Sequence, residues 1–342
     1  MGLVEVHGEI KLSTFYYKGG QSDADTVKLD IENGFARFRA NKNTGWKNVT
    51  HILLEGKINS NPVIKVYKNS AVKRLTVRLQ GIDAPELHFR ADSRKLGKNI
   101  KEKWDYTDYR QRGGAKATWE LVNKIEEYKD PHKDIVKAHT LSRVKSPNDA
   151  FDVHGRFVGD VVIKRNGKPD LNINRWLIEQ GWAFPAFYNS MTEQEINAII
   201  EKSQKPKPDQ AISKDYSSRL LPFNANLKFV KNPPIDHTND NGPVNYPKIF
   251  RRLIQFKVGK KAGAYEQPNL REYLLRTSNK DFCYETDEFL KKGENATKHR
   301  LGKFVSKKGV IGFKPHEIVI IEDLSADLLD KDGRVIESWN HS

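Results

Sequence analysis

Residues 76–86, Thr-Val-Arg-Leu-Gln-Gly-Ile-Asp-Ala-Pro-Glu, are the most informative stretch of this chain. An apolar segment carries one cation, Arg78, and runs into a proline-containing turn with two carboxylates, Asp83 and Glu86. Alternate side chains of a strand point to opposite faces, so Arg78 and Gln80 share one face. One cation and two anions are costly to gather at the end of a strand unless other charges complete the balance. A metal ion and a phosphate group would complete it.

The composition favours a globular protein with an anionic partner. The chain has 342 residues, which is long enough for two domains. It is 37% hydrophobic and 10% aromatic, which is enough for a buried core. Its formal net charge is +15, and a charge of this sign favours a polyanion, most simply nucleic acid, as the partner. A basic protein without such a partner is the alternative.

Other classes of protein are excluded by what the sequence lacks. Cys283 is the one cysteine, so there is neither a disulfide framework nor a cysteine-based zinc site. No stretch approaches about 18 consecutive apolar residues, which excludes a membrane-spanning helix. The first residues show no basic segment followed by an apolar one, so no signal peptide is visible. We therefore expect a cytoplasmic protein with no membrane partner, although a secreted mature form would show the same sequence.

The first 205 residues alternate between strand and helix patterns. Period-two alternation predicts strands, and apolar residues at helical spacing predict helices. Gly181 is a typical helix C-cap, and Thr192 with Glu195 forms a capping box that opens a helix. The predicted strands are 5–17, 26–31 and 157–164, and the predicted helices are 115–128, 172–180 and 192–203.

The last third of the chain has a different character. Residues 206–245 are rich in proline and predict an extended linker. The strand-like runs that follow, at 249–258, 304–313 and 317–322, predict a small β-rich domain over 246–342. The net charge of that domain is only +5 of the total, which weakens the idea of a dedicated DNA-binding tail. Substrate choice, docking of a protein partner and self-association stay open as its roles.

Three clusters of charged residues occur in a fixed order. They are Asp-Ala-Asp-Thr-Val at 23–27, the arginine, aspartate and glutamate of 78–86, and Asp-Val-His-Gly-Arg at 152–156. Together they resemble the motifs of the staphylococcal nuclease (thermonuclease) family, Asp-Gly-Asp-Thr-Val, Arg-x4-Asp-x-Pro-Glu and Asp-x-Tyr-Gly-Arg. Ala24 stands where the family has glycine. The resemblance covers about residues 5–205.

This resemblance implies a fold and an activity. The fold class is a β-rich α+β protein with a five-stranded OB-type barrel and packed helices, in which residues 28–74 and 87–114 are insertions. A second, small β-rich domain would follow it. The activity implied is metal-dependent hydrolysis of DNA, RNA or both, with products that end in 3′-phosphate.

The resemblance also implies a calcium site and a general base. Asp25 and Asp83 match the carboxylates that bind Ca²⁺, and the carbonyl of Ala84 is in the place of a third ligand. Oxygen ligands of this kind suit Ca²⁺ or another hard divalent cation. Glu86 matches the carboxylate that positions or deprotonates the attacking water. Outside the context of the three clusters, each of these acids would be a turn-capping residue.

Five further residues are implied to contact the substrate. Arg78 and Arg156 match the two guanidinium groups that bind the phosphate, a task for which the planar arginine fork suits better than lysine. His154 stands where the family often has tyrosine. Phe187 and Tyr188 are near the residues that line the nucleotide pocket, where one would stack on a base, and core packing of both is the alternative.

Two functions from different classes therefore remain. The first is a calcium-dependent nuclease with a C-terminal accessory domain. The second is a catalytically silent or partner-activated nucleic-acid-binding module on the same fold. The five intact charged residues favour the first, since a degenerate copy would have lost some of them: Asp25, Arg78, Asp83, Glu86 and Arg156.

Overall fold

A computed structural model describes most of the chain. The described residues are 2–41, 43–48, 51–58, 61–68, 74–93, 98–144, 147–152, 156–165, 167–220, 227–228, 242–322 and 327–329. None of the helices in these residues has the length and apolar character needed to cross a membrane.

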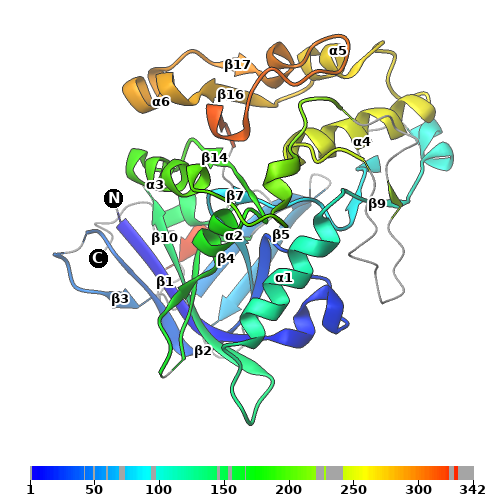
Figure 1. Ribbon diagram of the computed structural model, residues 1–342. Coiled ribbons are helices and arrows are strands. Elements are labelled where there is room, and N and C mark those ends of the chain that lie inside the picture. Colours follow the sequence, from blue (N-terminus) through cyan, green and yellow to red (C-terminus); the bar gives the residue numbers. More distant parts are fainter. Residues whose placement is uncertain are drawn as a thin grey trace.

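A closed barrel of five strands forms the centre of the fold (Figure 1). The strands follow one another around it in the order β1, β10, β11, β6 and β2, and pairing of β1 with β2 closes the ring. The β6–β11 pair is parallel and the others are antiparallel. This mixed barrel confirms the predicted OB-type fold. The barrel strands are β1 (Gly2–Lys11), β2 (Thr26–Arg39), β6 (Leu75–Leu79), β10 (Ile135–Val144) and β11 (Phe157–Ile163).

The alternation in the sequence sets which side chains fill the barrel. Along β11, Phe157, Gly159, Val161 and Ile163 are buried, while the alternate residues between them are half-buried. Gly8 on β1 is required where β1 crosses β2, because a Cβ there would lie 2.3 Å from the carbonyl oxygen of Asp30. The register of the β1–β2 pair shifts beside this glycine, which lets the sheet curl into a ring.

Three helices cover the barrel, and all three predicted helices are confirmed. They are α1 (Gly114–Glu126), α2 (Ile173–Gln180) and α3 (Glu193–Gln204). The side chain of Asn172 caps α2, which ends at Gly181 with a φ of 72°. Thr192 and Glu195 form the capping box of α3. These local signals set the ends of both helices without help from tertiary contacts.

Several short elements decorate the barrel. The short strands are β3 (Lys47–Asn48), β4 (His51–Ile58), β5 (Asn61–Lys68), β7 (Ile82–Asp83), β8 (Phe89–Arg90), β9 (Asp108–Arg110), β12 (Leu171–Asn172), β13 (Phe184–Pro185), β14 (Phe187–Tyr188), β15 (Leu227–Lys228), β16 (Phe282–Glu285), β17 (His299–Arg300), β18 (Ile318–Ile320) and β19 (Asp327–Leu329). Within the insertion 28–74, β4 and β5 form a hairpin, and β19 from the far end of the chain pairs with β4.

The C-terminal part is more helical than the sequence predicted. The strand expected at 249–258 is wrong, because these residues lie in helix α4 (Pro247–Lys261). Two shorter helices follow, α5 (Leu270–Leu275) and α6 (Thr286–Lys292). The expected strand at 304–313 is also wrong, since that stretch contains a 3₁₀ turn and one isolated bridge between Val305 and Ile311. The strand expected at 317–322 is confirmed as β18.

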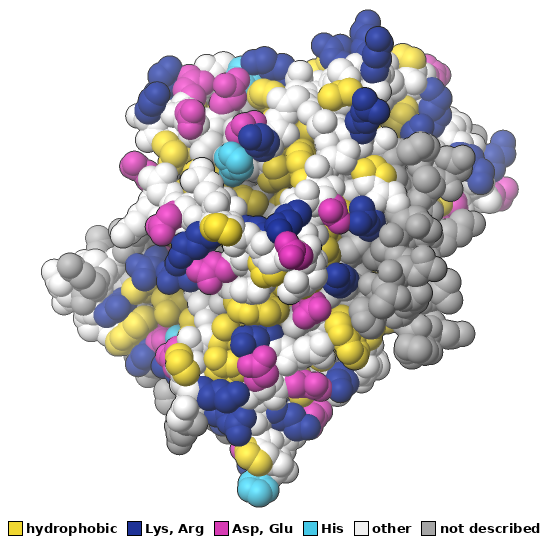
Figure 2. Space-filling view, viewed as in Figure 1, with side chains coloured by type: hydrophobic (Ala, Val, Ile, Leu, Met, Phe, Trp, Pro, Cys, Tyr) yellow, Lys and Arg dark blue, Asp and Glu magenta, His cyan; other side chains and the backbone are white. Residues whose placement is uncertain are grey.

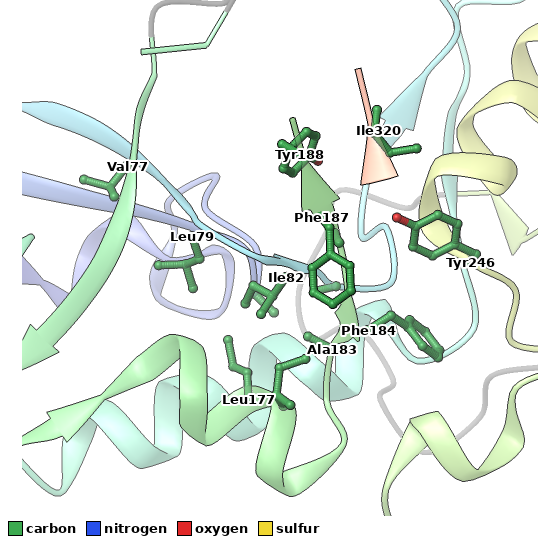
Figure 3. Close-up of a cluster of buried hydrophobic side chains, with 14 of the residues drawn as sticks. Val77, Leu79, Ile82, Leu177, Ala183, Phe184, Phe187, Tyr188, Tyr246 and Ile320 are labelled. Atoms are coloured by element: carbon green, nitrogen blue, oxygen red, sulfur yellow. The ribbon is translucent and has the colours of Figure 1, made fainter. Parts of the chain in front are cut away.

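The barrel part and the C-terminal part share one hydrophobic core. Strand β14 pairs with β18, so residues on either side of the expected linker build the same sheet. In Figure 3, Phe187 and Tyr188 lie beside Ile320 and Tyr246, and all four are buried. The C-terminal residues form a second layer over the barrel in Figure 1. This packing argues against a C-terminal domain that folds independently.

The expected linker is only partly within the described residues. Residues 206–220 pack on the protein, with Ile212 buried in the core. Isolated bridges join Tyr216 to Val244 and Arg219 to Val310. Where it is described, this segment is therefore part of the fold and not an extended connection.

Candidate active site

Arg78 lies where the three charged clusters of the sequence meet. On β6 it is opposite Thr26 of β2, which directly follows Asp25. On the other side of β6 it is opposite Val158 of β11, two residues after Arg156. The backbone amide of Leu79 also donates to the carbonyl oxygen of Asp25, at 2.9 Å. Strand pairing therefore brings together residues that are far apart in the chain.

The turn after β6 places the two carboxylates that the sequence singled out. Gly81 adopts a φ of 76°, which reverses the chain after the strand. Asp83 then pairs with Phe184 of β13, and its side chain is 1% exposed. Two hydrogen bonds with Gln111 hold the backbone of Glu86. The Glu86 amide donates to Gln111 Oε1 at 3.3 Å, and the Glu86 carbonyl oxygen accepts from the Gln111 amide at 2.7 Å.

An arginine from α4 binds both of these carboxylates. Arg251 Nη1 and Nη2 donate to Asp83 Oδ1 and Oδ2, at 3.0 and 2.8 Å. The Nη1 atom also donates to Glu86 Oε1. A guanidinium that engages two carboxylates in this way forms a strong, charge-assisted contact. Arg251 is therefore part of the site, although the sequence analysis did not include it.

Arg78 is enclosed by groups from two parts of the chain. Its guanidinium donates to the hydroxyl oxygen of Tyr188 and lies 4.7 Å from the centre of that ring. Its Nη1 atom lies 3.3 Å from Oε1 of Glu322, which follows β18, and 3.9 Å from Oδ2 of Asp152. The Arg78 side chain is 9% exposed. The cation expected to bind phosphate thus already has a carboxylate partner.

Arg156 is held against Asp152 at the entry to β11. Its Nε atom donates to Oδ2 of Asp152 at 2.8 Å, and its backbone amide donates to Oδ1 at 2.9 Å. The Arg156 side chain is 28% exposed, so its guanidinium reaches the surface beside Arg78. His154 lies outside the described residues, and its predicted substrate contact stays a prediction.

Burial and charge crowding shift the pKa values of the acids. Burial raises the pKa of Glu86 to about 7, with Arg251 opposing the shift and Asp25 and Asp83 adding to it. Burial and the neighbouring Asp25 raise the pKa of Asp23 well above its ordinary value. Although burial acts against it, the cations Arg156 and Arg78 hold the pKa of Asp25 below its ordinary value. Asp23 and Asp25 also share a hydrogen bond, so a proton on Asp23 is bound between the two carboxyls.

Part of this site lies in a region that is similar to a known family. Residues 76–210 match the family model described as staphylococcal nuclease homologue. The match does not extend to Asp23 and Asp25. No curated protein matches the chain. A domain of this family indicates a nuclease or a nucleic-acid-binding function.

The matched range of the nuclease homologue domain covers only part of the site. It includes Arg78, Asp83, Glu86 and Arg156, and it leaves out Arg251 and Glu322. Those two residues come from the C-terminal part and reach the site through tertiary packing. Their contribution is therefore a feature of this chain outside the region that the family model describes.

The donors expected to bind calcium are suited to a hard cation by their chemistry. Asp25 and Asp83 supply carboxylate oxygens, and Ala84 supplies a carbonyl. Asp25 accepts from Thr26 Oγ1 at 3.0 Å, which leaves further acceptor capacity. Both oxygens of Asp83, in contrast, accept from Arg251. In the described residues no group of three or more His, Cys, Asp or Glu side chains is placed to hold a metal. Both oxygens of Asp83 are therefore engaged by Arg251, and a cation could use them only in place of Arg251.

The two predicted nucleotide-pocket residues have different environments. Phe187 is fully buried, with 0% exposure, in the core that the barrel shares with the C-terminal part (Figure 3). This burial leaves no face of Phe187 for a base to stack on, so it agrees with the core-packing alternative. Tyr188 is buried too, but its hydroxyl contacts Arg78, the cation that is predicted to bind phosphate.

The sequence contains weak signals for the helix that carries Arg251, which the sequence analysis missed. Pro247 suits the first turn of a helix, and Ile249, Leu253 and Phe256 recur at helical spacing. That spacing favours a helix over 247–261 and places Arg251 on it. No feature of the sequence links Arg251 to the acids it contacts, which lie 165 and 168 residues away.

A separate cavity lies on the other side of α2. It has a volume of about 220 Å³ and is lined by residues of α2 and α3 with Gln80 and Asp160. None of the residues predicted for the site lines it. The chemistry proposed below therefore concerns the charged cluster and not this cavity.

Proposed function

We propose that this protein is a nuclease that hydrolyses phosphodiester bonds of DNA, RNA or both at the cluster around Arg78. The observation that supports it most is the strand pairing around Arg78, which brings Asp25, just before β2, and Asp152 and Arg156, just before β11, close to it. The nuclease homologue domain gives independent support.

In this proposal the arginines bind the phosphate. A phosphodiester is anionic and repels an anionic nucleophile, so its charge must be neutralised before attack. Arg78 and Arg156 supply guanidinium forks that donate two parallel bonds to phosphate oxygens. Such donors, fixed in place by strand β6 and by Asp152, lower the energy of the charged transition state by about 3–4 kcal/mol each.

Glu86 is the general base of the proposed reaction. It accepts a proton from water while the water oxygen attacks phosphorus, and the bond from phosphorus to the 5′ oxygen breaks. The leaving oxygen takes up a proton, so the products end in a 5′-hydroxyl and a 3′-phosphate. A base that reaches the water contributes about 10²–10⁴-fold.

We also propose that the reaction depends on Ca²⁺ or another hard divalent cation. Asp25, Asp83 and the Ala84 carbonyl would hold it. When bound, such an ion neutralises the phosphate and polarises its oxygen. The donors become available to it when Arg251 releases Asp83.

A silent or partner-activated form of the domain is the second candidate. It is favoured by one observation, namely that Glu322 and Arg251 already pair with Arg78 and Asp83. If these pairs are never released, the surface binds nucleic acid without cleaving it. The C-terminal part would then be the element on which an activating partner acts. On the face shown in Figure 2, Lys and Arg are interspersed with Asp and Glu.

One assay separates the two candidates. The full chain is incubated with single- and double-stranded DNA and RNA, each in calcium chloride, magnesium chloride or excess chelator. The nuclease proposal expects cleavage that the chelator abolishes and fragments whose 3′ ends lose phosphate on treatment with phosphatase. Full cleavage in chelator would contradict the cation dependence. Binding of nucleic acid without any cleavage would favour the second candidate.

A further inference from the structure

Helix α4 brings Arg251 to the acids from a rigid position. One face of the helix, with Ile249 and Leu253, is buried in the main core, and Phe250 and Ile254 are buried in a second cluster. The side chain of Gln255 ties α4 to the segment that precedes α1. Its Oε1 atom accepts from the amide of Asp92 at 2.6 Å, and its Nε2 atom donates to the carbonyl oxygen of Asp92 at 3.0 Å. The backbone of α4 is thus fixed, and only the side chain of Arg251 is free to change position.

The neighbouring cations on α4 are directed elsewhere. Arg252 donates to both oxygens of Asp281, at 2.5 and 2.6 Å, and Lys248 lies 3.7 Å from Asp281. Of Lys248, Arg251 and Arg252, Arg251 alone therefore pairs with Asp83 and Glu86 in the described contacts.

The contact of Arg251 uses the Asp83 oxygens that the proposed cation would need, and it also engages the proposed base, Glu86. Both carboxylate oxygens of Asp83 accept from Arg251, and so does one oxygen of Glu86. Asp83 is 1% exposed and Arg251 is 18% exposed, so the pair is largely shielded from water. A buried carboxylate must have a partner, which means that a metal ion and the guanidinium are alternatives at Asp83.

We propose that Arg251 is an internal cation that competes with the divalent ion for Asp83, and that it also occupies Glu86 while it is bound there. This inference rests on the proposed function, because it concerns the same site. Arg251 balances the acids when no ion is bound, and a divalent ion binds only as the guanidinium leaves. The apparent affinity for the ion is then the intrinsic affinity multiplied by the fraction of molecules in which Arg251 has left the acids. Arg251 is a positioning residue here, since it acts through Asp83 and Glu86.

A purely structural ion pair predicts a different result. Removing one partner of a buried pair leaves an uncompensated charge and destabilises the protein. Both interpretations therefore expect Arg251→Gln to melt at a lower temperature in chelator. Only competition expects the variant to bind a divalent ion more tightly than the natural protein.

The experiment measures ion binding without any substrate. Calcium chloride is titrated calorimetrically into the full chain, into Arg251→Gln and into Arg252→Gln, which removes the next charge on the same helix. We expect Arg251→Gln to bind Ca²⁺ at least about 10-fold more tightly than the natural protein, because the competing cation is gone. Arg252→Gln should bind as the natural protein does. Arg251→Lys, which keeps the charge and loses the fork, should fall between them.

Melting temperatures provide a second readout if the glutamine variant is only marginally stable. An ion that binds the folded state raises the melting temperature in proportion to its affinity and concentration. Calcium should therefore raise the melting temperature of Arg251→Gln more than that of the natural protein. Unchanged or weaker binding by Arg251→Gln, or no binding by any of the four proteins, would overturn the inference. Tighter binding without cleavage of nucleic acid would uphold it and reject the nuclease proposal.

Discussion

Nη1 of Arg78 lies 3.3 Å from Oε1 of Glu322, a residue 244 positions further along the chain. The carboxylate of Glu322 therefore occupies a donor that the nuclease proposal assigns to the substrate phosphate. It is held there by the backbone, since the amide of Glu322 donates to the side chain of Asn189 at 3.1 Å. A phosphodiester must displace this carboxylate in order to reach Arg78.

Glu322→Gln should strengthen the binding of nucleic acid. The change removes the negative charge that competes with phosphate and keeps the shape of the side chain. We expect an affinity several-fold higher for a fluorescent single-stranded oligonucleotide, measured by anisotropy in excess chelator. Glu285→Gln is the matched control, because it removes one charge from an exposed position of the same sheet. Equal gains in both variants would mean that Glu322 acts only through net charge.

Glu86→Gln should slow cleavage while leaving binding intact. Glutamine keeps an oxygen that accepts from Arg251, and it cannot take a proton from water. The expected loss in kcat is about 10²-fold or more, as for the loss of a general base. Single-turnover cleavage and oligonucleotide affinity are measured together, and Glu201→Gln on the exposed face of α3 is the control. A rate close to that of the natural protein would show that Glu86 is not the base.

Arg78→Lys should be severely impaired in spite of the conserved charge. Lysine is a point charge, so it cannot donate two parallel bonds to a phosphate or stack on the ring of Tyr188. We expect kcat/KM to fall by about 10²–10³-fold. Arg74→Lys is the control, because Arg74 pairs with Asp30 on the exposed side at the start of the same strand. A similar loss of kcat/KM in both variants would mean that the substitutions disturb the sheet and not the phosphate contact of Arg78.

Local signals in the sequence predicted several elements of the barrel part. They did not predict β10, and residues 12–17 of the strand predicted at 5–17 form 3₁₀ turns except at Phe15. The alternation along β11, the Asn172 and Gly181 caps of α2 and the capping box of α3 depend on residues within one element. The motif resemblance then supplied the order in which the strands close. Together they predicted the OB-type barrel and gathered Asp25, Arg78 and Arg156 at one end of it.

The same reasoning failed where tertiary contacts decide. The apolar run at 249–258 is compatible with a buried strand or a buried helix, because periodicity is ambiguous when both faces of a segment are covered. It is covered on both faces in the structure, by two separate apolar clusters. Arg251 and Glu322 were missed for a related reason. Each reaches its partner across at least 165 residues of the chain, and no spacing in the sequence records that contact.

Removal of residues 246–342 should destabilise the barrel part. The truncated chain would lose β18, the neighbour of β14, and the side chains of Tyr246 and Ile320 that cover Phe187 (Figure 3). We expect residues 1–245 to be poorly soluble or to melt at a clearly lower temperature than the full chain. A truncated protein as stable as the full chain would instead show that the two parts fold separately.

A point variant tests the shared core without removing an element. Ile320 on β18 is buried against the barrel part, with 2% of its side chain exposed. Ile320→Ala should lower the free energy of unfolding by about 2–4 kcal/mol, the usual cost of deleting a buried aliphatic side chain.

Val310→Ala is the control, because Val310 is 41% exposed and should change stability by less than about 0.5 kcal/mol. Denaturant unfolding monitored by tryptophan fluorescence measures both. Five of the six tryptophans precede the C-terminal part, namely Trp46, Trp104, Trp119, Trp176 and Trp182. A single transition shifted by Ile320→Ala would therefore mean that loss of a C-terminal contact unfolds the rest of the chain too. An unshifted barrel transition would contradict the shared core.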